Sequence, residues 1–260
     1  NMGTVVKALS LLNYFNHGRT EIGLSDLTRL SGMNKATVYR LMTELQESGF
    51  VEQADQDRSY RLGSQVLRLA ALREASVPIL SVSRRILREL SDVTGETTHI
   101  SLVQGEQLTS LSHAYSRQHA TKVTMEDAEI LTYHATSSGM AVLAFADDAF
   151  IGEILSRPLV SHTSNTVTDP EQIRQELQQI RQFGIAQSIG GFEAEVHSHA
   201  VPVFGPDRTP IGALAVAAPT SRMPPEQQKI IQTELLRLGT ELTNRIGGIA
   251  PASFPHTAAA

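Results

Sequence analysis

Hydrophobic positions recur at helical spacing in two short consecutive segments near the start of the chain, within residues 24–51 (LSDLTRLSGMNKATVYRLMTELQESGFV). Ser25 is a suitable N-cap for the first segment, and Ser31-Gly32 interrupts it. Asn34 can cap the second segment by accepting a hydrogen bond from a free backbone N–H. One face of this second segment is apolar and is formed by Val38, Leu41, Met42 and Leu45. The pattern therefore predicts two helices joined by a tight turn.

The second helix carries polar side chains on the rest of its surface. Its N-terminal half presents Lys35, Thr37, Tyr39 and Arg40. Hydrogen-bond donors in the first two turns are what a helix needs to read the major groove of DNA. The same pattern also fits a helical hairpin whose outer face is only solvated, so the flanking segments decide between the two.

A short hairpin is predicted directly after Gly49. Residues 50–53 and 60–62 resemble two short strands on either side of a polar loop. With the apolar helix at residues 5–15 in front, this order predicts a winged helix-turn-helix over residues 1–63. Arg58 and Arg61 of the hairpin are placed for phosphate contacts, which position a protein on DNA without reading its sequence.

The pattern of residues 64–77 predicts a linker helix that has more apolar surface than an isolated, solvated linker would have. This helix is expected to pack on a partner subunit, or alternatively to join the core of its own domain. Beyond it, helices are predicted at 79–93, 137–146, 149–156, 170–183 and from Pro225 through Leu242, and strands at 97–103, 107–114, 119–125, 184–189, 195–204 and 210–217.

Antiparallel strand pairs at both ends of this region predict an α+β sensor-like domain over residues 78–248 rather than a parallel doubly wound sheet. The fold class is thus α+β with two domains. Residues 249–260 are rich in proline and alanine, and we expect them to be disordered.

Composition and charge narrow the function classes only slightly. The 260 residues carry a net charge of −5, with +1 on residues 1–75 and −6 on the remainder. This asymmetry permits a local contact with DNA but does not predict one. The chain has no cysteine, which excludes disulfides and thiolate sites and fits a cytoplasmic location. Neither a signal peptide nor a membrane span is predicted.

The chain resembles the IclR family of bacterial transcriptional regulators from residue 5 to residue 247. The resemblance is carried by GTVVKALSLLNYF, GLSDLTRLSGMNKATVYRLMTELQESGFVEQ, YRLG, YHATSSGMAVLA, GIAQSIGGFEAEVHSHAVPVF and PIGALAVAAP, which stand in the family's order. It implies a GAF-like effector-binding domain after the linker helix. It also implies a homodimer or homotetramer on a double-stranded DNA operator, acting as repressor or activator, with no cofactor and no membrane partner.

The resemblance places the family's recognition helix on residues 34–48. Tyr39 and Arg40 are then expected to read bases, and arginine is the best bidentate partner of guanine. Asn34, Lys35 and Thr37 are expected to seat the helix on the DNA backbone. The alternative role for Arg40 is a salt bridge within the domain.

The resemblance also implies an effector pocket whose first wall is Ser137, Ser138 and Gly139 at a helix N-terminus. Such a terminus binds a carboxylate without a basic side chain. The opposite walls would be Ser188, Ile189, Val196, Ser198, Ala215 and Ala217. Family members often carry an acidic pair at 188–189, a cysteine at 198 and serines at 215 and 217. The departures predict a pocket that has lost a fixed negative charge and takes a small organic acid with an apolar body, rather than the smallest two- or three-carbon acids.

Two other kinds of site can be considered. Six histidines could suggest a metal site, namely His113, His119, His134, His162, His197 and His199. A zinc site needs three or four converging ligands, and solvated or singly hydrogen-bonded histidines are the simpler interpretation. A hydrolase using Ser137 or Ser198 is the alternative function, but the chain lacks a G-x-S-x-G elbow and a P-loop. The sequence therefore predicts a ligand-responsive regulator without a catalytic step.

Overall fold

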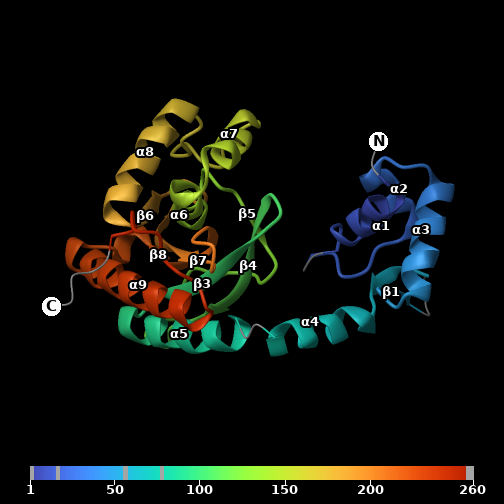
Figure 1. The fold of residues 1–260 in the computed structure, drawn as a ribbon, viewed down its shortest axis with the longest axis horizontal. Coiled ribbons are helices and arrows are strands. Elements are labelled where there is room, and N and C mark those ends of the chain that lie inside the picture. Colours follow the sequence, from blue (N-terminus) through green and yellow to red (C-terminus); the bar gives the residue numbers. More distant parts are fainter. Residues whose placement is uncertain (1–2, 16–17, 55–57, 77–78, 256–260) are drawn as a thin grey trace. The chain divides into compact units, whose positions relative to one another are not determined.

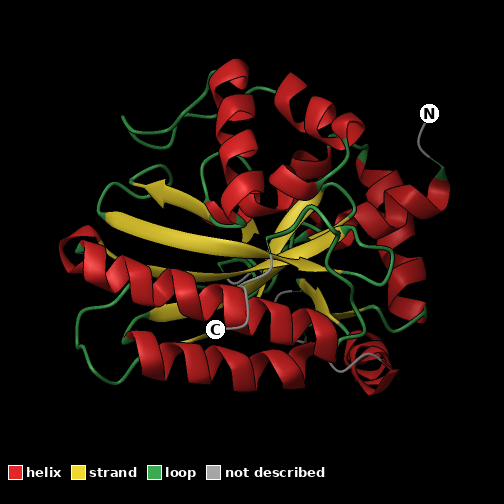
Figure 2. Ribbon diagram, turned by 60° about the vertical axis from the view of Figure 1, so that its left-hand side comes forward, coloured by secondary structure: helices red, strands yellow, loops and turns green. Residues whose placement is uncertain are grey.

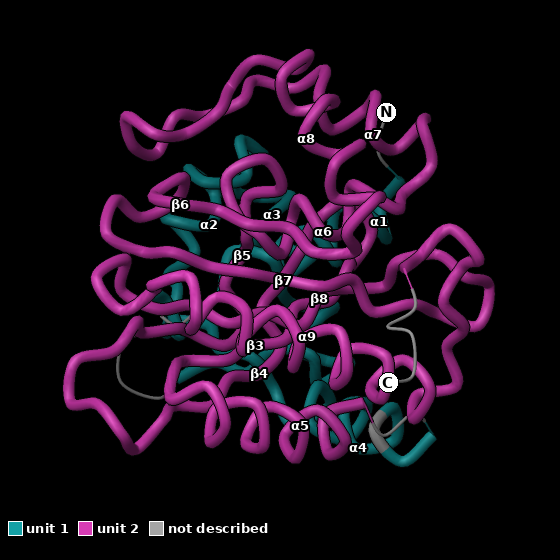
Figure 3. Tube along the Cα trace, turned by 90° about the vertical axis from the view of Figure 1, so that its left-hand side faces the viewer, with its two compact units in different colours: residues 1–78 teal, residues 79–260 magenta. Residues whose placement is uncertain are grey.

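The chain forms two compact units, residues 1–78 and 79–260 (Figures 1 and 3). The structure is a computed structural model that describes residues 3–15, 18–54, 58–76 and 79–255. Unit 1 has a hydrophobic core of its own, and unit 2 has two clusters of buried side chains. The predicted α+β architecture with two domains agrees with this division.

Unit 1 is a winged helix-turn-helix followed by one further helix. Its elements are α1 (Thr4–Leu12), α2 (Leu24–Ser31), α3 (Lys35–Glu47), β1 (Val51–Gln53), β2 (Tyr60–Leu62) and α4 (Ser64–Ser76). The predicted apolar face of α3 is buried, and it packs on α1 and α2 around Leu11 and Leu27. β1 and β2 pair antiparallel, and Ile22 bridges to Tyr60 beside them. The predicted hairpin after Gly49 is confirmed.

The turn between α2 and α3 depends on local backbone chemistry. Gly32 ends α2 with a φ of 65°, a conformation that glycine adopts without steric cost. Asn34 caps α3 as predicted, because its side chain accepts a 2.8 Å hydrogen bond from the Thr37 N–H. The prediction for α2 is wrong by two residues, since Gly23 is its N-cap and Ser25 lies inside the helix.

Two helices of unit 1 leave apolar side chains exposed. On α1 these are Val5, Val6 and Leu9, and on α4 they are Leu67, Leu69 and Leu72. None of the described side chains of α4 is buried. The alternative that this helix belongs to the core of its own domain is therefore wrong.

Unit 2 is a six-stranded antiparallel sheet between two layers of helices (Figure 2). The strand order is β5-β4-β3-β8-β7-β6. Its elements are α5 (Ile79–Thr94), β3 (Thr97–Gln104), β4 (Gln107–Ala114), β5 (Ile130–Leu131), α6 (Ser137–Phe145), α7 (Asp148–Ser156), α8 (Pro170–Phe183), β6 (Ala186–Ile189), β7 (Val196–Phe204), β8 (Pro210–Pro219), η1 (Thr220–Arg222) and α9 (Pro225–Arg245).

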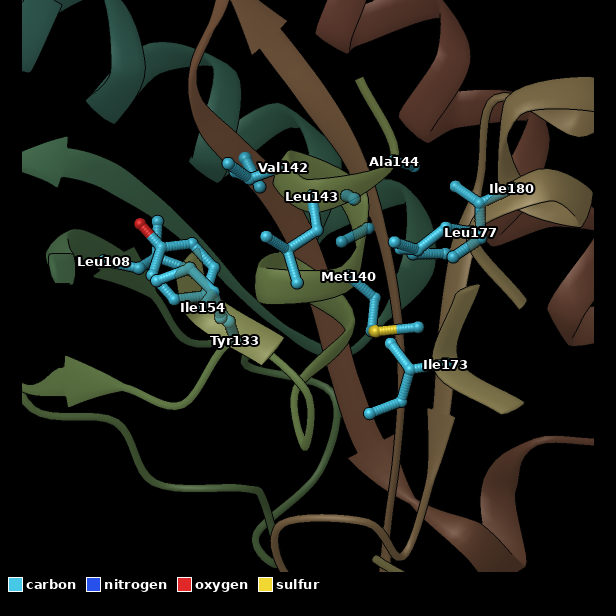
Figure 4. Close-up of a cluster of buried hydrophobic side chains, with 14 of the residues drawn as sticks. Leu108, Tyr133, Met140, Val142, Leu143, Ala144, Ile154, Ile173, Leu177 and Ile180 are labelled. Atoms are coloured by element: carbon cyan, nitrogen blue, oxygen red, sulfur yellow. The ribbon is translucent and has the colours of Figure 1, made fainter. Parts of the chain in front are cut away.

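Each face of this sheet supports one hydrophobic cluster. Helices α6, α7 and α8 cover one face, where Met140, Leu143 and Ile173 pack together (Figure 4). Helices α5 and α9 cover the other face. Along β8, Ala213 and Ala215 belong to the α6 face, whereas the neighbouring Leu214 and Val216 belong to the α9 face, as expected for a pleated strand. None of the described helices is long and apolar enough to cross a membrane.

Two expectations for unit 2 differ from the structure. Residues 119–125 form no strand, because side chains rather than a neighbouring strand bond their backbone: Thr97 donates to the Val123 carbonyl, and the Tyr115 hydroxyl contacts both backbone polar groups of Met125. Residues 249–255 were expected to be disordered, but Phe254 is buried and stacks edge-on against Phe145 and Phe204. The remainder of that predicted tail, residues 256–260, lies outside the described residues.

Candidate functional site

The outer surface of α3 presents three of the predicted DNA contacts to solvent. Lys35 is exposed, Tyr39 is 57% exposed, and 62% of the Arg40 side chain is exposed. Asn34 and Thr37 differ from these three, because the Asn34 side chain is already bonded to the Thr37 backbone. The Asn34 side chain therefore caps the helix start through the Thr37 backbone, while the other three side chains extend into solvent.

Arg40 forms an ion pair within its own helix, as the alternative prediction held. Its Nη1 atom lies 3.5 Å from Oε1 of Glu44, one turn away, and both side chains are more than half exposed. Exposed pairs at this spacing contribute roughly 0.3–0.5 kcal/mol. Such a weak contact is easily exchanged for a phosphate or a base.

The two arginines of the wing differ in their surroundings. Arg58 is exposed and has a φ of 57°, and its carbonyl accepts a 2.7 Å hydrogen bond from the Gln53 side chain. Arg61 is paired with Glu52 at 2.7 Å and lies 3.9 Å from Glu21. The charge of Arg61 is therefore already compensated by carboxylates.

Unit 2 contains a cavity of about 50 Å³ at the N-terminus of α6. Its walls come from β3, from residues 123–136, and from the β6–β7 and β8 segments. The lining residues are His99, Val123, Met125, Glu129, Leu131, Ala135, Thr136, Ser137, Ser138, Ser188, Phe192, Glu193, Val196, Ser198 and Ala217. A volume of this size holds roughly three to five water molecules, so it suits a compact ligand.

The structure brings most of the predicted effector contacts together around this cavity. The residues that line it as predicted are Ser137, Ser138, Ser188, Val196, Ser198 and Ala217. Three others do not line it, and each has a physical reason. Ile189 is half-exposed on the opposite face of β6, where it borders a separate groove with Gln187. Ala215 points toward α6 but is covered by the core.

Gly139 has a packing role instead of a place in the cavity wall. A Cβ atom at this position would lie 2.2 Å from the carbonyl oxygen of Tyr133, so no larger residue fits. Its N–H is also occupied, because it donates a 3.0 Å hydrogen bond to the Thr136 hydroxyl that caps α6. Helix geometry leaves the preceding N–H groups, those of Ser137 and Ser138, without partners inside the helix.

His99 lines the cavity and was not identified from the sequence. It lies on β3 and is buried, and its Nε2 atom is 3.1 Å from the Ser138 hydroxyl. Its Nδ1 atom has no hydrogen-bond partner among the residues that the structure describes. Burial, with a smaller effect of His113, lowers the pKa of His99 to about 4, so the ring is neutral near pH 7. A histidine within the alternating pattern of residues 97–103 was the available signal.

Two carboxylates of the cavity were also missed. Glu129 and Glu193 line it, and the lining residues that the structure describes include neither lysine nor arginine. Burial raises the pKa of Glu129, and the nearby Glu126 and Glu193 raise it further. The predicted loss of negative charge at positions 188–189 is thus offset by carboxylates from other segments. Both glutamates lie outside regular periodic patterns, so no sequence signal singled them out.

The geometry around the other candidate residues is that of ordinary packing. Within the described part of the chain, no group of three histidine, aspartate or glutamate side chains could hold a metal ion. His197 and His199 share the α9 face, where their rings stack at 4.9 Å. The serine–histidine contact in the cavity joins Ser138 and His99, and no carboxylate orients this imidazole as a catalytic triad requires.

Comparison with known proteins identifies related chains along nearly the whole sequence. The family profile "IclR helix-turn-helix domain" matches residues 4–55, and "Bacterial transcriptional regulator IclR C-terminal" matches residues 72–243. The HTH-type transcriptional regulator XynR of Escherichia coli K12 is 27% identical, covering 94% of this chain and 97% of XynR.

Two crystal structures extend the comparison. A regulator of the IclR type from Silicibacter sp. TM1040 is 70% identical with a TM-score of 0.95, covering 97% of this chain and all of that one. An IclR homologue from Microbacterium hydrocarbonoxydans, complexed with 4-hydroxybenzoate, is 25% identical with a TM-score of 0.77, covering 93% and 100% of the two chains. These likenesses confirm the winged helix-turn-helix and the GAF-like α/β domain.

Proposed function

The chain belongs to the IclR family of bacterial transcriptional regulators, and on that premise we propose that a small organic acid in the cavity of unit 2 controls its binding to operator DNA. The matched families and relatives are transcriptional regulators, not enzymes, so the hydrolase alternative is wrong. The observation that carries the proposal is the N-terminus of α6 in the cavity wall, with the N–H groups of Ser137 and Ser138 unpaired inside the helix.

The cavity combines one anion-binding end with an apolar body. The α6 N-terminus favours a carboxylate through its free N–H groups and the helix dipole. Apolar side chains supply much of the remaining wall, including Val123, Leu131 and Val196. The Microbacterium homologue was crystallised with an acid of this kind, since 4-hydroxybenzoate joins a carboxylate to a ring. We therefore propose an acid with a compact apolar body as the effector.

The DNA contacts are proposed from the exposed surface of unit 1. Helix α3 would enter the major groove with Tyr39 and Arg40 toward the bases and Lys35 toward a phosphate. Asn34 and Thr37 would present the N-terminus of α3 to the backbone, and Arg58 and Arg61 of the wing would contact phosphates.

The regulator is proposed to act as a homodimer or homotetramer, with a DNA-binding domain over residues 1–63, a linker helix over 64–77 and an effector domain over 78–248. The support is the exposed apolar surface of α1 and α4, which a second copy would cover. An acid that binds one arrangement of the subunits more tightly shifts the population toward it and changes the spacing of the paired DNA-binding domains.

The effector site can be tested by filling the cavity. Val196→Trp adds bulk to the lining, whereas Ile189→Trp introduces the same side chain on the opposite sheet face. Calorimetric titration of carboxylic acids into the full chain should show binding to the wild type and to Ile189→Trp but not to Val196→Trp. Equal binding to the wild type and Val196→Trp, with both folded by thermal melting, would place the effector elsewhere.

A further inference from the structure

We propose that the effector is a zwitterion, an acid that also carries a cationic nitrogen held between Glu129 and Glu193. This inference rests on the proposed function and narrows the effector from small organic acids in general to those that also carry a positive charge. The carboxylate would bind at the α6 N-terminus, and the positive group would face the two glutamates across the cavity. Amino acids and betaines are the compounds with this arrangement of charges.

Both glutamates belong to backbone that is fixed by hydrogen bonds. Glu129 directly precedes β5, and its carbonyl accepts a 2.8 Å hydrogen bond from the Ser110 N–H on β4. The carbonyl of Glu193 accepts a 3.1 Å bond from the Val196 N–H, which begins β7. The backbone at both glutamates, which line the cavity, is therefore held in place by these bonds.

The charges around the cavity disfavour a simple anion. Neither Glu129 nor Glu193 forms an ion pair with any described residue, and the cavity lining described contains no lysine or arginine. The Lys122 ammonium lies 4.4 Å from the centre of the Tyr115 ring. A monoanionic ligand would thus add negative charge beside two unpaired carboxylates, whereas a cationic nitrogen in the same ligand would pair with them.

His99 gives an independent indication that a polar ligand group completes the site. Its ring lines the cavity and is buried, and its Nδ1 atom has no hydrogen-bond partner within the described part of the chain. Buried polar atoms in folded proteins are nearly always hydrogen-bonded. In the tautomer whose Nε2–H donates to the Ser138 hydroxyl, Nδ1 is an acceptor for the N–H of a ligand ammonium group, a bond that a quaternary nitrogen, which has no N–H, does not make.

The decisive probes are pairs of acids with the same shape and different charge. Glycine betaine and 3,3-dimethylbutanoate differ only in the replacement of the quaternary nitrogen by carbon. L-Valine with (2S)-2,3-dimethylbutanoate, and 4-aminobutanoate with pentanoate, test primary ammonium groups near to and far from the carboxylate. Each compound is titrated calorimetrically into the full chain in the presence of EDTA, so that no metal ion mediates binding.

We expect the zwitterion of at least one pair to bind roughly tenfold more tightly than its partner, mainly through the half-buried Glu129 and with a smaller contribution from Glu193, which is exposed. In the Glu129→Gln/Glu193→Gln double variant this preference should disappear, and the simple acid should bind better than it does to the wild type. Glu126→Gln and Glu195→Gln are matched controls, since these exposed residues lie near the site but outside its lining. Both single controls should keep the preference.

The outcomes separate this inference from the proposed function. If the simple acids bind as tightly as their zwitterionic partners, or if the double variant keeps the preference, the inference is overturned while an acid effector stands. If no compound of any pair binds, whether zwitterion or simple acid, both the zwitterion and the acid site at α6 are overturned. Melting curves of each variant confirm that the substitutions leave the fold intact.

Discussion

Arg40 is the side chain on which sequence-specific DNA recognition is proposed to depend most. Its ion pair with Glu44 is exposed and weak, so DNA can displace it. Arg40→Ala should lower operator affinity by roughly 1–3 kcal/mol and relax the preference for operator over unrelated DNA. Fluorescence anisotropy with both DNAs measures this. Arg29→Ala, which removes another largely exposed arginine, paired with Asp26 on α2, is the control. Unchanged affinity and preference in Arg40→Ala would remove Arg40 from the readout.

His99 should make stability depend on pH. Its pKa is lowered from 6.5 to about 4, so the unfolded chain binds a proton more readily than the folded one between these values. The stabilisation is complete above pH 6.5 and is lost as the pH falls toward 4, by roughly 3 kcal/mol in total. Urea unfolding at pH 7, 6 and 5 should therefore show a steeper decline for the wild type than for His99→Gln. The exposed His119→Gln should decline like the wild type, and identical slopes for all three would contradict this account.

Interactions between residues close in sequence could be predicted from the sequence, whereas contacts between residues far apart in the chain could not. The Asn34 cap and the buried face of α3 depend on neighbours within one or two turns, and both predictions are confirmed. Glu129 and Glu193 are far apart in the chain and meet at the cavity only through the sheet. No periodicity or motif could place those two carboxylates beside the α6 N-terminus.

At the scale of elements, α6 depends on close contact between Gly139 and the backbone at Tyr133. Gly139→Ala should destabilise unit 2 by at least about 3 kcal/mol, because the new methyl group would overlap backbone atoms. Gly152→Ala in α7 is the matched control, since no atom lies within 4 Å of its Cβ position. That substitution should be neutral or stabilising by up to about 1 kcal/mol. Thermal unfolding compares them, and equal melting temperatures would contradict the packing role of Gly139.

The strands explain which parts of the candidate site could be predicted. The bounds of β3, β4 and β7 follow from alternating apolar and polar residues, and the structure has them nearly as predicted. The prediction of Ser188 and Ile189 as joint pocket residues ignored the pleat, which turns neighbouring side chains to opposite faces. Residues 119–125 have a strand-like composition but bond to side chains, a competition that only the tertiary structure decides.

At the scale of the whole molecule, the exposed leucines of α4 are proposed to hold subunits together. Leu67 and Leu72 are 75% and 56% exposed. Leu67→Ser/Leu72→Ser should shift the sedimentation equilibrium of the chain toward the monomer without changing its helix content. Val160→Ser, an equally exposed apolar position of unit 2, should leave the association unchanged. A double variant that associates like the wild type would show that α4 is not the contact.

The order of domains was predictable because each unit carries its own patterns: a helical pair with a wing in unit 1, and strands framed by amphipathic helices in unit 2. The chemical class of the ligand was harder to predict from the sequence, because it depends on charges that several separate segments bring to one cavity. The resemblance to the IclR family thus predicts a regulator with an acid-binding helix end, and the structure adds two glutamates and a buried imidazole to the lining of the proposed site.

The central claim is that an acid bound in unit 2 changes the affinity of unit 1 for operator DNA. The most direct measurement is the operator dissociation constant, by fluorescence anisotropy, with and without a saturating acid that calorimetry shows to bind. We expect a change of roughly 5- to 150-fold in the wild type and in Ile189→Trp, and none in Val196→Trp. An operator affinity that stays the same at saturating acid in the wild type would contradict it.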